Sequence, residues 1–364
     1  MGKKWLSMCL VVLLLVSGAT GTVFARDDLY VYYLDVGQAE ATLLKGPGFT
    51  ILIDAGDSGR NDVVEHLEKW HVETIDLFIV THPHADHIGQ GRAVLETFEV
   101  AEVWLSGYEH ATWLFEDFLD ALLESEARYH EPRRGEHFNF GELNLEVLNP
   151  STITTNLHGS NVVVRATYGD VTFLFTGDAE RRTERDMLAD NLVFEAEILS
   201  LGHHGSRTSS SMDFLLAVRP EVAIFSAGQP NSFGHPHEEV INRLAIVEVP
   251  MYGTDRNGTI IVWTDGTDYS VYSESGAELV EVGVQNGEYP DPEQGVELNS
   301  AGLEDLQRIL HIGPARAASI MELRETLPLR SVDDLKWVPG LDTQRIEEIK
   351  QQGLAYVKGV MEDQ

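Results

Sequence analysis

The chain has 364 residues, a length that suits two domains, and its apolar content of 43% is enough for a sizeable core. The formal net charge of −33 keeps the protein soluble and opposes non-specific binding to nucleic acid. The single cysteine, Cys9, excludes a disulfide framework and a thiolate metal site, so any metal ligands must be histidine, carboxylate or carbonyl groups.

The chain begins with a predicted secretory signal peptide over residues 1–25. Lys3 and Lys4 supply its positive start, residues 8–16 an apolar core, and the residues up to Ala25 a small-residue cleavage site. The apolar run is too short for a comfortable transmembrane helix. We therefore expect an exported protein, periplasmic or extracellular, with no stable membrane insertion once the leader is removed; an uncleaved anchor is the alternative.

From residue 29 the pattern changes to short apolar strands between glycine and proline, predicted at 29–35, 41–45 and 50–53. Helical spacing of apolar or charged residues predicts helices at 61–70, 113–123 and 180–190. A hairpin is predicted across Gly169-Asp170, and further strands at 75–80, 197–200, 222–225 and 259–264. Mixed strands and helices predict a layered α/β domain over residues 27–274.

The last part of the chain differs in composition. Residues 275–295 are rich in Gly, Glu, Asp and Pro and predict an acidic linker. Helices are then predicted at 303–310, 315–325, 332–335 and 343–352. We therefore predict a second, small all-α domain over residues 296–357.

The densest group of metal-capable side chains follows the buried strand 75–80. His82, His84, Asp86 and His87 fall within six positions, as H-x-H-x-D-H. Alternate spacing lets His82 and His84 reach one ion from a tight turn, whereas Asp86 and His87 can reach a second ion nearby. The pattern resembles the metallo-β-lactamase superfamily of hydrolases. The resemblance implies an αββα sandwich with the metal site at one sheet edge.

Two aspartates at other strand ends extend this site. Asp178 follows a predicted strand, and its two carboxylate oxygens can bridge two ions, which is the role that the resemblance implies. The resemblance also implies that Asp54, at the end of strand 50–53, orients a ligand histidine.

Further histidines follow later strands. One of the adjacent His203 and His204 is expected to complete the second ion's site. We favour His204, with His203 as a neighbour that could hold phosphate or a proton, although spacing alone does not separate them. His235 and His237 lie on a later loop. His235 is the stronger candidate for contacting substrate or donating a proton to the leaving group, and the start of a helix is the alternative.

One expected ligand departs from the pattern. Many members of the superfamily have a further histidine where this chain has Asn161. His158 could reach the same place from three residues earlier. The first ion is thus expected to have fewer protein ligands and more water.

The motifs in order are D-V-G-Q, H-P-H-A-D-H-I-G, T-G-D, G-H-H-G-S and F-G-H-P-H-E. Together they resemble the hydrolase domain of DNA-internalisation competence proteins, over nearly all of residues 29–263. Ala39-Glu40 stands where that branch usually has Gly-Asp. No stretch of this sequence corresponds to the multi-span membrane channel of those proteins.

The C-terminal domain resembles tandem helix-hairpin-helix modules of competence-type DNA receptors. The resemblance makes Gly313, Ala315, Arg316 and Gly340 candidate nucleic-acid contacts, because glycines there let backbone N–H groups approach a phosphate. His311 and Asp342 replace the other usual glycines, and the segment is not basic overall. A protein-contact or packing role is therefore an equal alternative.

The sequence thus predicts a hydrolase with two divalent metal ions, zinc first and manganese second. The expected catalytic group comprises Asp86, Asp54, His203 and His235. The preferred function is an exported nuclease or phosphodiesterase acting on DNA, with a competence-related role. Hydrolysis of a small or wall-linked phosphodiester, or of another ester, is one alternative. A DNA or protein docking factor without catalysis is the other.

Overall fold

The computed structural model describes residues 28–190, 192–276, 279, 296–326, 329, 331–341, 343–352 and 355–357. The predicted leader, most of the predicted linker and Asp342 lie outside these residues. Within the described residues, none of the helices combines the length and the apolar character that crossing a membrane requires.

The first sheet has eight strands in the order β17-β16-β1-β2-β3-β5-β7-β8. They are β1 (Leu29–Tyr33), β2 (Thr42–Gly46), β3 (Phe49–Ile53), β5 (Leu77–Val80), β7 (Glu102–Leu105), β8 (Arg128–His130), β16 (Ile260–Thr264) and β17 (Tyr269–Ser273). The strands β3, β5, β7 and β8 run parallel, so their carboxyl ends lie at the same edge. Every residue of β5 is buried, as expected for a strand covered on both faces.

The second sheet has seven strands in the order β15-β14-β13-β12-β11-β10-β9. They are β9 (His137–Phe140), β10 (Leu143–Asn149), β11 (Val163–Tyr168), β12 (Val171–Phe175), β13 (Ile198–Ser200), β14 (Val222–Phe225) and β15 (Met251–Gly253). The predicted hairpin across Gly169-Asp170 is the antiparallel pair β11 and β12. From β12 to β15 the strands are parallel, which gives this sheet its own edge of carboxyl ends.

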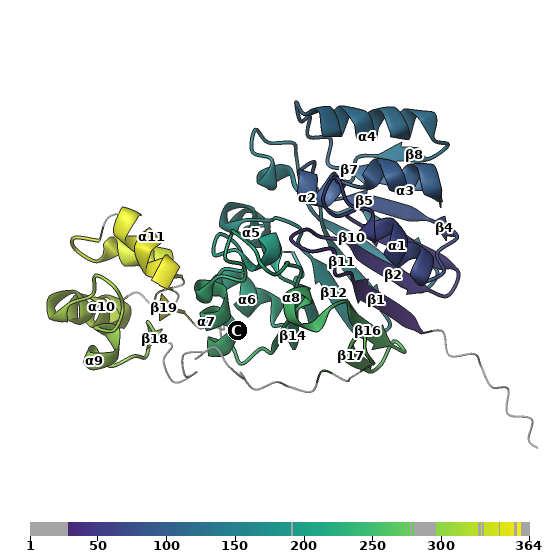
Figure 1. The fold of residues 1–364 in the computed structure, drawn as a ribbon. Coiled ribbons are helices and arrows are strands. Elements are labelled where there is room, and N and C mark those ends of the chain that lie inside the picture. The colour runs from purple at the N-terminus through teal and green to yellow at the C-terminus, as the bar shows by residue number, and fades with distance from the viewer. Residues whose placement is uncertain are drawn as a thin grey trace, which may run out of the picture.

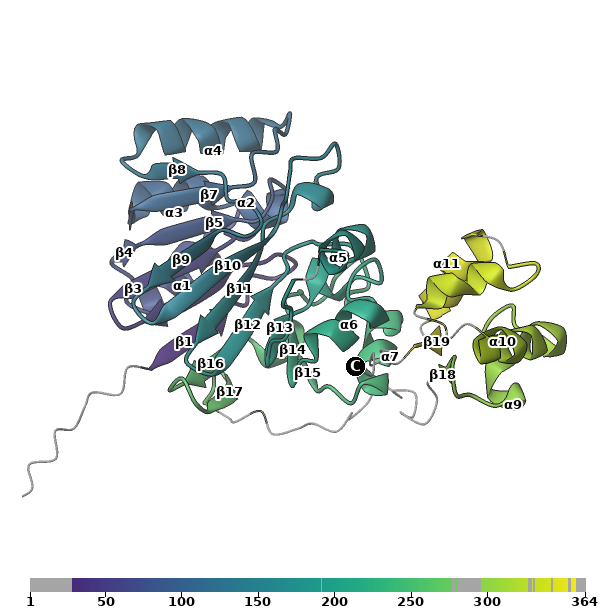
Figure 2. The same ribbon diagram turned by 180° about the vertical axis from the view of Figure 1, so that it is seen from behind.

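The two sheets pack face to face with helices on both outer faces (Figure 1, Figure 2). Ile51, Ile79 and Phe173 belong to the core between the sheets. The first sheet is covered by α1 (Asp62–Lys69), α3 (Gly91–Thr97) and α4 (Trp113–Glu124), and the second by α5 (Arg181–Leu188), α6 (Met212–Val218) and α7 (Glu238–Ile246). The predicted αββα sandwich is therefore confirmed.

Helix α4 illustrates how the sequence sets these layers. The Thr112 hydroxyl accepts a hydrogen bond from the Phe115 N–H and caps the helix. Phe115, Phe118 and Leu122 then recur at helical spacing and are buried against the first sheet. Phe118 meets Phe78 of β5 edge to face, with ring centroids 6.0 Å apart. Short elements complete this domain: β4 (Thr74–Ile75), α2 (Ala85–Ile88), β6 (Glu99–Val100) and α8 (Thr254–Asn257).

The C-terminal domain has a core of its own, to which Ile309, Ile320 and Ile349 belong. Its elements are β18 (Val296–Glu297), α9 (Leu303–Leu306), α10 (Pro314–Thr326), a 3-10 helix (Val332–Trp337), α11 (Thr343–Gln352) and β19 (Ala355–Tyr356). The parallel pair β18 and β19 joins the two ends of the domain, and the sequence did not predict it. The predicted helix 303–310 is shorter, because the Ile309 N–H bonds the Leu306 carbonyl in a tighter turn.

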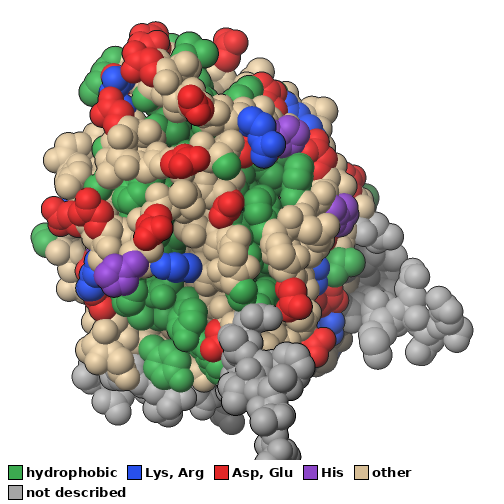
Figure 3. Space-filling view, turned by 90° about the vertical axis from the view of Figure 1, so that its right-hand side faces the viewer, with side chains coloured by type: hydrophobic (Ala, Val, Ile, Leu, Met, Phe, Trp, Pro, Cys, Tyr) green, Lys and Arg blue, Asp and Glu red, His purple; other side chains and the backbone are tan. Residues whose placement is uncertain are grey.

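The surface reflects the composition. Asp and Glu side chains are scattered over the face seen in Figure 3, which carries few Lys or Arg side chains. This distribution agrees with 59 Asp and Glu against 26 Lys and Arg in the whole chain.

Candidate metal centre

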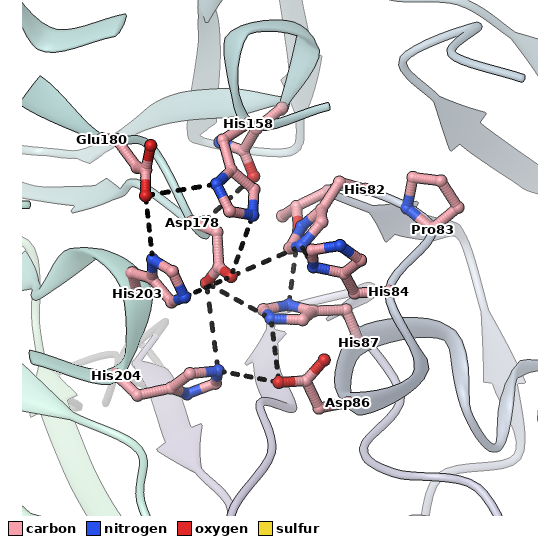
Figure 4. Close-up of polar contacts among 12 residues, drawn as sticks. His82, Pro83, His84, Asp86, His87, His158, Asp178, Glu180, His203 and His204 are labelled. Carbon is pink, nitrogen blue, oxygen red and sulfur yellow. Dashed lines mark hydrogen bonds and ion pairs between the residues drawn. The ribbon is translucent and has the colours of Figure 1, made fainter. Parts of the chain in front are cut away.

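The candidate site lies where the carboxyl ends of parallel strands from both sheets meet. Asp54 follows β3, His82 comes two residues after β5, and Asp178 comes three residues after β12. His203 and His204 lie on the short 3-10 turn Gly202–Gly205 after β13. Because parallel strands present their carboxyl ends at one edge, residues far apart in the sequence converge there (Figure 4).

The first cluster contains His82, His84, His158 and Asp178, whose nearest ligand atoms all lie within 4.8 Å of one another. The Oδ2 atom of Asp178 is 3.4 Å from His82 Nε2 and 3.9 Å from His158 Nε2. Burial, followed by the charge of His87, lowers the pKa of His82 to about 3. The His82 ring is therefore neutral near pH 7, as a metal ligand must be.

The sequence named His158 only as a residue that could reach the place occupied by Asn161. His158 begins the 3-10 turn His158–Ser160, which brings its ring against those of His82 and His84, with centroids 5.6 and 5.1 Å away. The first cluster thus offers three histidines and a carboxylate as candidate ligands, more than the expectation of a first site with fewer protein ligands. The one signal in the sequence was a histidine three residues from the expected place.

Asn161 has a different task. It is fully buried, and its side-chain amide donates to the Thr176 carbonyl at 2.8 Å. Its Oδ1 atom accepts a hydrogen bond from the Asp178 backbone N–H at 3.1 Å. Asn161 therefore holds the turn from Thr176 to Asp178 in shape and does not face either cluster as a ligand.

The second cluster contains Asp86, His87 and His204. The Nε2 atom of His204 is 3.2 Å from Asp86 Oδ2 and 3.9 Å from Asp178 Oδ1. The same Oδ1 atom lies 3.3 Å from His87 Nε2. Asp178 thus turns one carboxylate oxygen toward each cluster, the arrangement that a bridging ligand needs (Figure 4).

Two hydrogen bonds fix which ring nitrogen of these histidines is free. The Nδ1–H of His87 donates to Asp54 Oδ2 at 2.7 Å, and the Nδ1–H of His204 donates to the Ser226 carbonyl at 2.9 Å. Asp54 is itself held by the Thr81 backbone N–H at 2.8 Å and the Thr81 hydroxyl at 2.7 Å. The Nε2 lone pairs of both rings therefore point into the cluster.

A divalent ion fits both clusters. His87 Nε2, His158 Nε2 and Asp178 Oδ1 are buried and make no hydrogen bond within the described residues. Burial alone would lower the pKa of His87, but the carboxylates of Asp178, Asp54 and Asp86 raise it well above its usual value. Buried polar atoms are nearly always paired, and imidazole with carboxylate is a donor set that divalent transition metals take.

His203 belongs to a third group, with His158 and Glu180. His203 Nε2 is 3.5 Å from Asp178 Oδ2, and His203 Nδ1 is 3.6 Å from Glu180 Oε1. His203 and His204 both have left-handed backbone, with φ of 53° and 56°. Such backbone costs about 1–3 kcal/mol per residue and is kept where it aims side chains. Here it aims the two adjacent rings at different oxygens of Asp178, with Glu180 beside His203 and Asp86 beside His204.

His235 lies beside the second cluster. Gln38 Nε2 donates to His235 Nδ1 at 3.3 Å, and the His235 ring stacks on that of His204 with centroids 6.0 Å apart. Burial and the neighbouring histidines lower the pKa of His235 to about 4. His237 instead accepts a hydrogen bond from the Arg207 backbone N–H at 3.2 Å, just before α7, so it secures the loop.

The candidate nucleic-acid residues of the C-terminal domain divide into two kinds. Gly313 and Ala315 are exposed, and the space beside Gly313 is open. Arg316 instead donates to the His311 carbonyl at 2.6 Å and to the Gly340 carbonyl at 2.9 Å. Its guanidinium therefore joins the two hairpins.

Residues 34–229 match the family model of the metallo-beta-lactamase superfamily. The chain belongs to this superfamily. Residues 291–352 match the model of the helix-hairpin-helix motif, so both predicted resemblances are confirmed at the level of the family.

The sequence is also similar to individual known proteins. ComE operon protein 3 of Bacillus subtilis is 27% identical over 247 residues, 62% of this chain and 32% of that protein. Competence protein ComA of Neisseria gonorrhoeae is 28% identical over 246 residues, 65% of this chain and 32% of that protein. A deoxyribonuclease of Thioalkalivibrio is 40% identical over 72 residues, 20% of this chain and 19% of that protein. The chain thus spans about a third of the length of the first two of these relatives.

Proposed function

We propose that this chain is an exported, metal-dependent phosphodiesterase or nuclease that acts on DNA, with a role related to competence. The observation that carries the proposal is the pair of clusters that share Asp178, with buried nitrogen and oxygen atoms left unpaired inside them. The helix-hairpin-helix motif and the names of the competence and deoxyribonuclease relatives support DNA as the substrate. The predicted leader over residues 1–25 supports export.

In this proposal one ion is held by His82, His84, His158 and Asp178, and the other by Asp86, His87, His204 and Asp178. Zinc is the first candidate and manganese the second. When bound, such ions lower the pKa of a water ligand to about 7 and neutralise charge on a phosphoryl group.

The side chains around the clusters have tasks of their own. Asp86 is 34% exposed whereas Asp178 is 1% exposed, so Asp86 is the cluster carboxylate that an incoming water reaches. Asp54 keeps the His87 ring in the tautomer with Nε2 free. His203 lies beside Asp178 and can hold a phosphate oxygen.

His235 is assigned to the substrate. Since its Nδ1 accepts from Gln38, its ring proton lies on Nε2, from which it can donate to a phosphate or leaving-group oxygen. Asn231 fixes this loop, because its Oδ1 accepts from the His235 N–H at 2.9 Å and its amide donates to the His235 carbonyl at 2.8 Å.

The test combines elemental analysis of the purified protein with a substrate panel of linear DNA, circular DNA and an aryl phosphodiester. We expect close to two metal ions per chain and cleavage of DNA. His84→Ala removes a predicted ligand of the first cluster and should lose most of this activity. A His84→Ala protein that hydrolyses as fast as the parent would refute the metal mechanism.

The same panel separates the rival functions. Cleavage of the aryl ester without cleavage of DNA would favour a small or wall-linked phosphodiester. Retarded migration of DNA without cleavage of any substrate would favour a docking factor.

A further inference from the structure

A hollow of about 300 Å³ lies beside the metal centre, between the larger domain and the C-terminal domain. Its walls come from α5, the loop before α6, and α7 on one side, and from the 3-10 helix Val332–Trp337, α11 and β19 on the other. Both views of the ribbon place β19 next to α7 (Figure 1, Figure 2). We refer to it as the interdomain cavity.

The charge of the interdomain cavity is opposite to that of the chain. Six basic side chains line it: Arg181, Arg182, Arg185, Arg207, Arg243 and Lys350. They meet four acidic ones, although acidic residues outnumber basic ones by 59 to 26 in the whole sequence. A basic concavity on a strongly acidic protein concentrates anions where the rest of the surface repels them.

Several of these cations already have partners. Arg181 pairs with Glu347 at 2.6 Å, and Lys350 pairs with Asp333. The buried Arg243 donates to the carbonyls of the loop before α6.

Arg182 and Arg185 differ from them. Both are exposed on α5, and neither has an ion pair or side-chain hydrogen bond within the described residues, although the charge of Arg185 acts on the Asp213 carboxylate. Arg207, the remaining cation, lies 3.8 Å from Glu239. Arg182 and Arg185 are therefore the lining cations without an ion pair among the described residues.

Two lining residues of the interdomain cavity also contact histidines of the site. Glu180 Oε1 is 3.4 Å from His158 Nδ1 and 3.6 Å from His203 Nδ1. The Thr208 hydroxyl is 3.3 Å from His203 Nδ1. The interdomain cavity therefore adjoins the third group of the site, separated from it by the side chains of Glu180 and Thr208.

We propose that the interdomain cavity binds a phosphate of the substrate backbone that lies away from the cleaved bond, through Arg182 and Arg185. The inference rests on the proposed function and deepens it: the site selects a polyanionic strand over a small phosphodiester. Two arginines without an ion pair suit a phosphodiester backbone, because a guanidinium donates two parallel N–H groups to phosphate oxygens.

The experiment uses the full metal-loaded chain and a double variant, Arg182→Gln/Arg185→Gln. The control is Arg128→Gln/Arg219→Gln, which removes the same charge from two exposed arginines outside the interdomain cavity. Two quantities are measured at several salt concentrations: the Kd of a fluorescein-labelled single-stranded oligonucleotide by anisotropy, and kcat/KM for that oligonucleotide and for an aryl phosphodiester.

We expect the cavity variant to bind the oligonucleotide about tenfold more weakly at low salt, with a slope of log K against log salt that is smaller by about 0.7, as loss of one neutralised phosphate predicts. The ratio of kcat/KM for the oligonucleotide to that for the aryl ester should fall about tenfold as well, mainly through KM. The control variant should change both quantities less than twofold.

The outcomes separate this inference from the proposed function. A parent protein that cleaves DNA, together with a cavity variant that matches the control in Kd, salt slope and kinetic ratio, overturns the inference alone. A parent that neither binds nor cleaves the oligonucleotide overturns both. A second arm replaces single phosphates of the oligonucleotide by neutral methylphosphonates. At one position away from the cleaved bond, this replacement should weaken binding to the parent and not to the cavity variant.

Discussion

Replacing Asn161 tests what this residue does. Its hydrogen bonds indicate that it supports the turn from Thr176 to Asp178; the alternative is that it only occupies the position of a missing metal ligand. In Asn161→Ala, the Asp178 N–H and the Thr176 carbonyl each lose a buried partner. The Thr176 carbonyl still accepts from the Ala179 N–H at 3.0 Å, so the Asp178 N–H is the group left unpaired. One unpaired buried group costs about 1–3 kcal/mol, so the free energy of unfolding should fall by about that amount. For a domain of this size that corresponds to a fall in Tm of roughly 2–12 °C.

The loss should extend to metal binding. The Asp178 N–H positions the carboxylate that faces both clusters, at 3.4 Å from His82 Nε2 and 3.3 Å from His87 Nε2. A carboxylate released from such a support typically loses about 10–100-fold in metal affinity. The measurements are thermal unfolding of the metal-free protein and titration of a competing chelator.

A histidine at the same position makes the test sharper. If Asn161 only occupies the position of a missing ligand, Asn161→His should raise the metal affinity. If Asn161 supports the turn at Asp178, Asn161→His should lower the metal affinity about as much as the alanine variant does. The matched control is Asn139→Ala, because Asn139 is exposed and its Oδ1 accepts only from the Asn144 amide at 3.0 Å. An Asn161→Ala protein with the Tm and metal affinity of this control would refute the reasoning.

Four further outcomes are expected. His158→Ala should bind about one metal ion fewer per chain in elemental analysis, because it removes one histidine of the first cluster. Asp54→Asn should lower metal affinity about 10–100-fold, since the amide no longer holds the His87 ring with Nε2 free; a chelator titration measures this. Chelation should lower the Tm of the parent, because a ligand held at 1,000 times its Kd stabilises the folded state by about 4 kcal/mol. Arg316→Ala should destabilise the C-terminal domain by about 1–3 kcal/mol, through its lost bonds to His311 and Gly340; hydrogen exchange in that domain should rise and that in the larger domain should not.

Much of the larger domain could be predicted because its main signals are local. Buried apolar runs followed at once by metal-capable side chains mark β5, β12 and β13 in the sequence, and each is a strand whose end contributes to the site. The sequence does not say which strands are neighbours. That depends on the registers that bring Ile53 beside Ile79 and Phe175 beside Ser200, which are set by packing between distant segments.

For some of the elements that the sequence did not predict, the structure gives a physical reason. β8 (Arg128–His130) is an edge strand with exposed polar residues, and β9 (His137–Phe140) alternates only between partly and fully exposed positions. Neither offers the buried alternation that marks a strand. The pair β18 and β19 consists of two residues each and is stabilised by its place in the C-terminal core, which no local pattern reveals.

The histidine missing from the expected place shows the limit of motif spacing most clearly. A ligand is defined by where its nitrogen lies, and the turn His158–Ser160 moves that nitrogen into the first cluster from outside the expected position. The side chain of Asn161 instead forms hydrogen bonds with the backbone of Thr176 and Asp178 in the T-G-D motif. At Gly177, where φ is +47°, an added Cβ would lie 2.4 Å from Asn161 Oδ1. The glycine and the asparagine therefore depend on each other, although one was interpreted as part of a motif and the other as a departure from it.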